Sequence, residues 1–314
     1  MFAFLKLIRL PNLLIIAFTQ YMVRWCLICP ILKIRGYELQ MNNISFFLLS
    51  LSTVMVAAAG YIINDYFDTK IDRINKPEKL LIDKSVKRRI AMGAHIVINI
   101  IAIAIGFTLC YLAGFWKLSV IYLICVAGLW YYSTTFKRKF LIGNLTIALF
   151  TAFVPMIVGV FELWLDYIRY SSIESPVDFS DIRKWVLGIS VFAFITTLLR
   201  EMIKDIEDYE GDKEYGCTTI PIVLGINKAK TIIVALIITT IAALGYLQYM
   251  QFQTNDMNSF YYFSAGIQLP FFFLIYKIIT AKEKKHFHFS SLFSKVIMVL
   301  GISYLFLFSY MLLS

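Results

Sequence analysis

Two groups of aspartates with the same spacing occur in this 314-residue chain. Each follows the pattern D-x-x-D-x-x-x-D. The first acidic set is Asp65, Asp68 and Asp72, and the second acidic set is Asp205, Asp208 and Asp212. On an α-helix, positions i, i+3 and i+7 fall within roughly 60° of one another around the axis. Each set is therefore expected to form an acidic face on one side of a helix.

The chemistry expected of such a face is metal binding. Crowded carboxylates repel one another unless a cation lies between them, and hard oxygen ligands favour Mg²⁺ or a similar ion. Asn64 precedes Asp68 by four residues, so its amide oxygen joins the same face. One acidic group at a helix end is often merely solvated, but two copies with identical spacing favour a function. Two such faces brought together would form a site for a diphosphate bridged by metal ions.

The elements that carry these faces are expected to be membrane-spanning helices. The chain is 60% hydrophobic and only 16% charged, and several apolar runs reach the length of about 20 residues that crosses a bilayer. This composition excludes a soluble domain. The expected fold is all-α, a polytopic membrane protein that forms one integral-membrane domain over residues 1–314. We expect about nine spans, near residues 13–34, 44–66, 90–113, 117–134, 141–164, 184–204, 228–250, 260–280 and 289–313.

The net charge of +10 could indicate a nucleic-acid partner, but its distribution indicates orientation in a membrane instead. With the N-terminus in the cytoplasm, the external segments contain few basic residues: Lys33, Arg35, Lys117, Arg169, Arg183 and Lys184. Basic residues thus collect in the internal loops, as the positive-inside rule requires. The C-terminus is then outside, since nine crossings separate the termini.

This topology places both acidic sets on one side of the membrane. The first set ends the second span, and the second set ends the sixth. Four crossings lie between them, an even number. We therefore predict that both sets reach a common mouth on the cytoplasmic side.

Basic side chains near this mouth are candidates for holding a departing diphosphate. Lys137 and Arg138 end the fourth span, and Arg200 and Lys204 precede the second acidic set. The alternative is that these four charges only orient the protein in the membrane. The apolar part of such a substrate would lie inside the helical bundle, among aromatic and aliphatic side chains.

The sequence from Asn64 to Asp72, N-D-Y-F-D-T-K-I-D, resembles the first motif of the UbiA-type intramembrane prenyltransferases, and Asp208 and Asp212 match their second motif, D-x-x-x-D. The similarity extends over essentially the whole chain, including R-L-P-N from Arg9 to Asn12 and I-G-N-L from Ile142 to Leu145. It implies a UbiA-type bundle that uses Mg²⁺ to transfer an isoprenyl group from its diphosphate to an acceptor, through a carbocation-like transition state.

The resemblance also implies roles for individual residues. By residue matching, the Mg²⁺ ligands would be Asn64, Asp68, Asp208 and Asp212. The remaining acids of the two sets, Asp65, Asp72 and Asp205, would lie close by, and we assign them as candidate catalytic residues.

The second motif region indicates which class of acceptor to expect. The stretch from Arg200 to Asp212, R-E-M-I-K-D-I-E-D-Y-E-G-D, is similar to that of the digeranylgeranylglyceryl phosphate synthases. These alkylate the free hydroxyl of geranylgeranylglyceryl phosphate in ether-lipid synthesis, which implies a geranylgeranyl-type donor and a lipid acceptor here. Family members that act on aromatic acceptors in quinone biosynthesis share the first motif fully, so an aromatic acceptor is the alternative.

Two polar residues within spans are further candidates for substrate contact. Arg24, near the middle of the first span, would contact either an anionic acceptor or a neighbouring helix. Asn144 would contact either substrate or another helix.

Two other classes of protein remain as alternatives. In a cation-coupled transporter the carboxylates would relay ions, but such residues normally lie near the membrane midplane on broken helices. A scaffold with vestigial motifs is disfavoured because both sets keep all their acids. We expect no obligate protein partner.

Overall fold

The computed structural model describes residues 2–75, 77–170 and 178–314. Over these residues it contains nine helices, some of them interrupted, that are long and apolar enough to cross a membrane. They are Leu10–Ile34, Asn43–Asn75, Arg88–Leu112, Trp116–Thr134, Ile142–Tyr170, Ser180–Glu207, Ile226–Gln253, Met257–Thr280 and Lys284–Leu313. The expected all-α fold and each of the nine predicted spans are confirmed. Many large apolar side chains on these helices are exposed, as is expected of surfaces that face lipid.

The chain divides into two compact units, one made of Met1–Lys137 and Phe153–Ser190 and the other of Arg138–Ala152 and Val191–Ser314. The expectation of one domain over the whole chain stays a prediction.

The first unit is built around α4, Asn43–Asn75. The helix α5, Arg88–Leu112, and the helix α6, Val120–Thr134, both pack against it. The N-terminal helices of this unit are α1, Phe2–Leu7, α2, Leu10–Met22, and α3, Cys29–Ile34. Short 3₁₀ turns occur at Pro77–Lys79 and Trp116–Ser119. The unit also includes the C-terminal part of α7, Ile142–Tyr170, and the start of α8, Ser180–Glu207.

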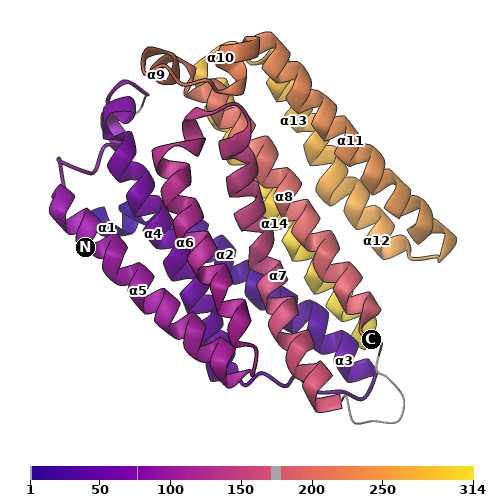
Figure 1. Cartoon of the computed structure of the whole chain (residues 1–314). Coiled ribbons are helices and arrows are strands. Elements are labelled where there is room, and N and C mark those ends of the chain that lie inside the picture. Colours follow the sequence, from indigo (N-terminus) through magenta and orange to yellow (C-terminus); the bar gives the residue numbers. More distant parts are fainter. Residues whose placement is uncertain (1, 76, 171–177) are drawn as a thin grey trace. The chain divides into compact units, whose positions relative to one another are not determined.

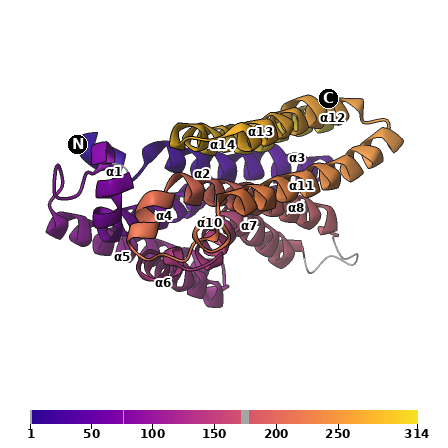
Figure 2. The same ribbon diagram turned by 90° about the horizontal axis from the view of Figure 1, so that it is seen from above.

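The second unit contains the remaining parts of α7 and α8, followed by six α-helical segments. A 3₁₀ turn at Phe136–Arg138 lies at the boundary between the units. The helical segments are α9, Tyr209–Glu214, α10, Ile220–Leu224, α11, Ile226–Gln253, α12, Met257–Tyr262, α13, Leu269–Thr280, and α14, Lys284–Leu313. The helix α13 packs against both α11 and α14 (Figures 1 and 2).

Two spans contain a π-helical turn, one at Val23–Ile28 and one at Phe263–Gln268. Each turn directly precedes a helix with proline at its second position, Pro30 in α3 and Pro270 in α13. Proline cannot donate a backbone hydrogen bond, and its ring clashes with the carbonyl four residues earlier. A wider π turn relieves this conflict within a continuous span.

Candidate functional site

The first acidic set lies on α4, which continues nine residues beyond Tyr66, the expected end of this span. Asp65, Asp68 and Asp72 all belong to the helix, so the predicted acidic face is present. A small apolar cluster packs at the same level of the helix, and its buried members are Leu7, Ile62, Ile82 and Ala91. This packing ties α1, α5 and the turn before α5 to the end of α4 that carries the acids.

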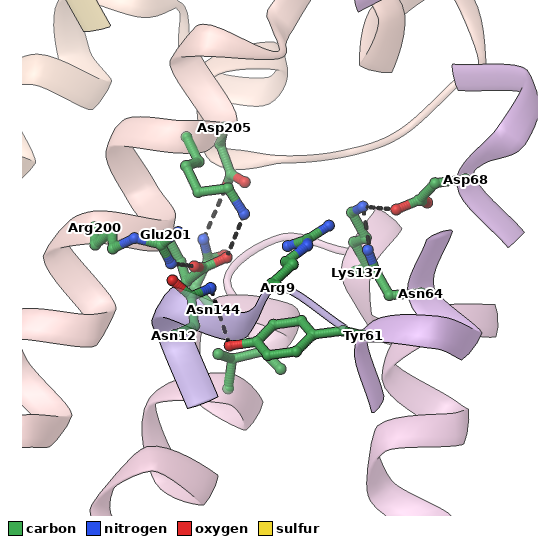
Figure 3. A network of polar contacts seen from close by, with 12 residues as sticks. Arg9, Asn12, Tyr61, Asn64, Asp68, Lys137, Asn144, Arg200, Glu201 and Asp205 are labelled. Atoms are coloured by element: carbon green, nitrogen blue, oxygen red, sulfur yellow. Dashed lines mark hydrogen bonds and ion pairs between the residues drawn. The ribbon is translucent and has the colours of Figure 1, made fainter. Parts of the chain in front are cut away.

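Lys137 connects the predicted metal ligands of this set. Its Nζ donates to Oδ1 of Asn64 at 3.5 Å and forms an ion pair with Asp68 (Figure 3). Asp68 is only 2% exposed. Burial lowers the pKa of the Lys137 ammonium, but the charge of Asp68 more than offsets this effect and holds the pKa above its ordinary value. Two oxygens one helical turn apart thus converge on a single cation.

Arg9 and Asn12 contact the same part of α4. The Arg9 guanidinium donates to Oδ1 of Asp65 at 2.7 Å. It also lies over the ring of Tyr61, whose hydroxyl accepts a bond of 3.2 Å from the Asn12 amide (Figure 3). Burial lowers the pKa of Arg9, but the charge of Asp65 outweighs this and raises it above its usual value. Asp65, a predicted catalytic residue, is therefore held by an arginine.

The second acidic set spans a break between two helices, which differs from the single continuous helix that we expected. Asp205 belongs to α8, Asp208 is the residue between α8 and α9, and Asp212 lies in α9. Helical hydrogen bonds continue across the break, from Asp208 N to Lys204 O at 2.8 Å and from Asp212 N to Asp208 O at 3.1 Å. The i to i−4 bonding of these two acids is therefore kept across the break. Gly211, which is buried, lies in the first turn of α9.

Asn144, a predicted substrate contact, lies against this set instead. Its amide donates to Oδ2 of Asp205 at 2.8 Å (Figure 3). Asn144 is on α7 and Asp205 is on α8, so this bond joins two helices. It corresponds to the helix–helix alternative for Asn144, while a contact with substrate stays a prediction.

The basic residues before the second set share a carboxylate that sequence reasoning did not single out. Arg200 pairs with Oε1 of Glu201, and Lys204 donates to Oε2 of the same residue at 3.2 Å. Glu201 is buried, so the two cations are held at a fixed place on α8. Arg138 is exposed, and its carbonyl accepts bonds from both the backbone and the hydroxyl of Thr218. Diphosphate contact by these basic residues stays a prediction.

Arg24 has a partner on a neighbouring helix. Its Nε donates to Oε1 of Glu162 at 2.7 Å, and the pair is almost fully buried, with 1% of each side chain exposed. This corresponds to the second of the two alternatives for Arg24. Contact with an acceptor stays a prediction.

The chain matches the UbiA prenyltransferase family over residues 38–308. This protein belongs to that family. It is 31% identical over 246 residues to a digeranylgeranylglyceryl phosphate synthase of Sulfurisphaera tokodaii, a match that covers 76% of this chain and 77% of the relative. It is also 31% identical to the synthase of that name from Methanosphaera stadtmanae, where the match covers 63% of this chain and 64% of the relative.

Solved structures confirm the UbiA fold. A UbiA homologue from Archaeoglobus fulgidus, solved with GPP and Mg²⁺, aligns with a TM-score of 0.56 at 16% identity, over 97% of this chain and 99% of that chain. Together with the nine apolar helices, membership of the UbiA family makes this chain an integral membrane protein.

The donor set of the first unit is suited to Mg²⁺ by its chemistry. Asn64 and Asp68 offer an amide and a carboxylate oxygen to one cation, and Mg²⁺ is usually held by one or two carboxylates together with phosphate oxygens and water. In the described part of the chain, no three His, Cys, Asp or Glu side chains gather as a complete metal centre. A Mg²⁺ ion held at either acidic set would therefore need further ligands, such as phosphate oxygens or water.

Sequence reasoning missed Arg9, Tyr61 and Glu201 as members of these networks. The R-L-P-N motif was a usable signal for Arg9 and Asn12, because it contributed to the resemblance to the UbiA family. Glu201 lies within the second motif region, but the resemblance implies no role for it. The role of Tyr61 could not be predicted from the sequence, because no spacing pattern relates it to Asn12.

Proposed function

We propose that this protein transfers a prenyl group from its diphosphate to a polar acceptor, and that it requires Mg²⁺ to do so. The observation that carries the proposal is the convergence of Asn64 and Asp68 on the Lys137 ammonium. These oxygens present a cation site at the end of a membrane helix, and a second acidic set of equal spacing occurs on α8 and α9. The Archaeoglobus fulgidus homologue was solved with GPP and Mg²⁺, which supports the same reaction class.

The two acidic sets would act on the same diphosphate. Asn64, Asp68, Asp208 and Asp212 would hold Mg²⁺, which supplies Lewis-acid stabilisation of the charge that develops on the departing diphosphate. Lys137 would move from Asp68 to a diphosphate oxygen when the metal is bound. Asp65 would stay oriented by Arg9, and Asp205 by Asn144.

In this reaction the bond between C1 of the prenyl chain and the diphosphate oxygen breaks, and the electron pair leaves with diphosphate. A new bond forms between C1 and the acceptor oxygen, and the proton of the acceptor hydroxyl passes to water or to the released diphosphate. Arg200 and Lys204, held by Glu201, would provide positive charge for an anionic acceptor or for the leaving group.

The acceptor we propose is geranylgeranylglyceryl phosphate, with a geranylgeranyl-type donor. Support comes from the names of the Sulfurisphaera tokodaii and Methanosphaera stadtmanae relatives and from the similarity of the Arg200–Asp212 region to such synthases. The active-site mouth and the N-terminus would face the cytoplasm, and the C-terminus would lie outside.

The metal assignment is tested with Asp68→Asn and Asp208→Asn. We expect each substitution to lower kcat for diphosphate release by about 10²–10⁴-fold. Because ligands of one shared site act as a unit, kcat of the double variant should be little lower than kcat of either single variant. Glu78→Gln and Glu214→Gln remove exposed carboxylates close to each set in sequence and should leave turnover unchanged. Full activity in both aspartate variants would refute the assignment, and losses that multiply would indicate two separate sites.

The acceptor is tested separately, with labelled geranylgeranyl diphosphate and a panel of acceptors. We expect alkylation of geranylgeranylglyceryl phosphate in the presence of Mg²⁺, and none after the metal is removed with EDTA. If only 4-hydroxybenzoate or a naphthoate is alkylated, the reaction class holds and the ether-lipid assignment is wrong.

A further inference from the structure

A second group of buried charges lies in the first unit, far from the first acidic set. It consists of Arg24 in the π-helical turn of the first span, and Glu162 and Asp166 near the end of α7. Arg24 also donates to Oδ1 of Asn43, the first residue of α4, at 3.2 Å. Asn43 and Asp68 are 25 residues apart on that helix (68 − 43), which is roughly 37 Å at about 1.5 Å per residue. This group therefore belongs to the opposite end of α4.

The contacts of Arg24 are directed to Glu162 and to the start of α4. Besides Glu162 and Asn43, the guanidinium donates to the carbonyl of Met41, and it lies over the ring of Phe46. Oε2 of Glu162 accepts a bond of 3.4 Å from Met41 N. Arg24 and Glu162 thus balance one another in charge.

Asp166 adds a second carboxylate that this pair does not balance. It lies one helical turn after Glu162 on α7, and the two carboxylates repel one another electrostatically. Asp166 is 0% exposed, and neither of its carboxylate oxygens has a hydrogen-bond partner among the described residues. Four residues further on, α7 ends at Tyr170, so Asp166 also lies at the negative pole of the helix dipole.

One positive and two negative side chains leave one uncompensated negative charge in a buried place. Buried charges are normally paired or bound to a metal ion. A proton on Asp166 would remove the charge, but the new O–H group would itself need an acceptor, and both oxygens are without a partner. A bound cation satisfies both oxygens at once. A single positive charge would make the group neutral, whereas a divalent ion would reverse its sign.

We propose that Asp166, together with Glu162, binds a monovalent cation, with Na⁺ as a hard ion suited to carboxylate oxygens. In secondary transporters, the C-terminal ends of half-helices help to coordinate Na⁺ in a comparable way. The site would fix the end of α7 to the π-helical turn of the first span and to the start of α4. It is independent of the proposed prenyl transfer, since it lies at the other end of the unit from Asp68.

The test is thermal unfolding of the purified full-length protein in NaCl or in choline chloride of equal ionic strength. For the wild type, we expect NaCl to raise Tm by about 4 °C or more, as binding to the folded state alone would do. Asp166→Asn should lose this response. In choline chloride the variant should be at least as stable as the wild type, because it removes a charge that nothing balances. Glu38→Gln, which removes an exposed carboxylate before α4, should respond as the wild type does.

A second measurement needs no variant. Line broadening of the ²³Na NMR signal should appear on addition of the wild-type protein and should be absent with Asp166→Asn. Three results would overturn the proposal: equal Tm of the wild type in both salts, a sodium response that Asp166→Asn retains, or stabilisation that follows acidification instead of sodium, which would indicate a proton on Asp166.

Discussion

Lys137 explains how a protein can keep Asp68 buried when no metal is bound. A buried carboxylate without a counter-charge is costly, and the ammonium of Lys137 supplies that charge from the turn after α6. Mg²⁺ and Lys137 would therefore compete for the same oxygen of Asp68. Binding of the metal would release the ammonium, and a diphosphate bound with the metal would give it a new partner.

This competition predicts opposite effects of Lys137→Met on metal and on substrate. Without Mg²⁺, the variant should lose about 1–3 kcal/mol of stability, because Asp68 is left without its partner. Mg²⁺ alone should then raise Tm by more than it does in the wild type. The KM for prenyl diphosphate should rise by about tenfold, since a charge-assisted contact to diphosphate is lost. Thermal unfolding with a magnesium titration and steady-state kinetics measure these effects.

Lys139→Met is the matched control, because Lys139 is exposed and lies two residues away on the same connection. It should change neither the magnesium response nor KM. A Lys137→Met variant with weakened magnesium binding would mean that Lys137 assists the metal instead of competing with it.

At the level of residues, spacing along the chain predicted the acids but not what holds them. Asn64 and Asp68 were predicted together because they lie one turn apart on one helix. The pairing of Asp68 with Lys137, of Asp65 with Arg9 and of Asp205 with Asn144 joins residues more than 50 positions apart. The 3.6-residue period of an α-helix predicts only which residues share a face of the same helix. Partners on other helices depend on packing, which no local pattern records.

At the level of elements, hydrophobic runs located all nine spans but placed several of their ends too early. Asp68 and Asp72 lie beyond Tyr66, the expected end of the second span, and the helix continues to Asn75. Just before this extension, Ile62 and Tyr66 of α4 pack against α5 and the turn before it. In the second set the helix ends at Glu207 and restarts at Tyr209. The repeated spacing predicted two equal faces, but it could not show that one of them crosses a break.

Close helix packing in the first unit gives a prediction at this scale. Gly106 of α5 faces Tyr122 of α6, and a Cβ added there would lie 2.4 Å from the tyrosine ring. Tyr122 is buried, and its hydroxyl bonds Ser52 of α4 at 2.9 Å. Gly106→Ala should therefore displace the ring, weaken the contact among three helices and cost about 1–3 kcal/mol of stability. The measurement is the midpoint of thermal or denaturant unfolding in detergent.

Gly93→Ala provides the control on the same helix. A Cβ at Gly93 meets nothing within 4 Å, so this substitution should leave stability unchanged or raise it slightly through helix propensity. Equal effects of the two substitutions would mean that Gly106 is not a point of close approach.

At the scale of the whole molecule, the proposed chemistry depends on both acidic sets reaching one side of the membrane. The even number of spans between them predicts this, and the basic loops predict that the side is the cytoplasm. Among the nine candidate spans of the described residues, the third to the sixth separate the two acidic sets. The expected even number of crossings between the sets is therefore unchanged. Hydrophobicity and segment length could predict the number of spans, because each span is one continuous segment of the sequence. The orientation depends on how the charged loops are placed relative to the membrane, which a single segment does not determine.

Single cysteines in a cysteine-free variant test this orientation in right-side-out vesicles. Lys84→Cys, before α5, and Glu214→Cys, in α9, should react with a membrane-impermeant maleimide only after the vesicles are opened. Lys117→Cys, at the other end of α5, should react in intact vesicles; all three positions are exposed. If positions 84 and 214 react from opposite sides, the two acidic sets cannot hold the same diphosphate, whatever each of them binds. If both react from outside, the shared site survives, but its mouth faces away from the cytoplasm and the positive-inside prediction is wrong.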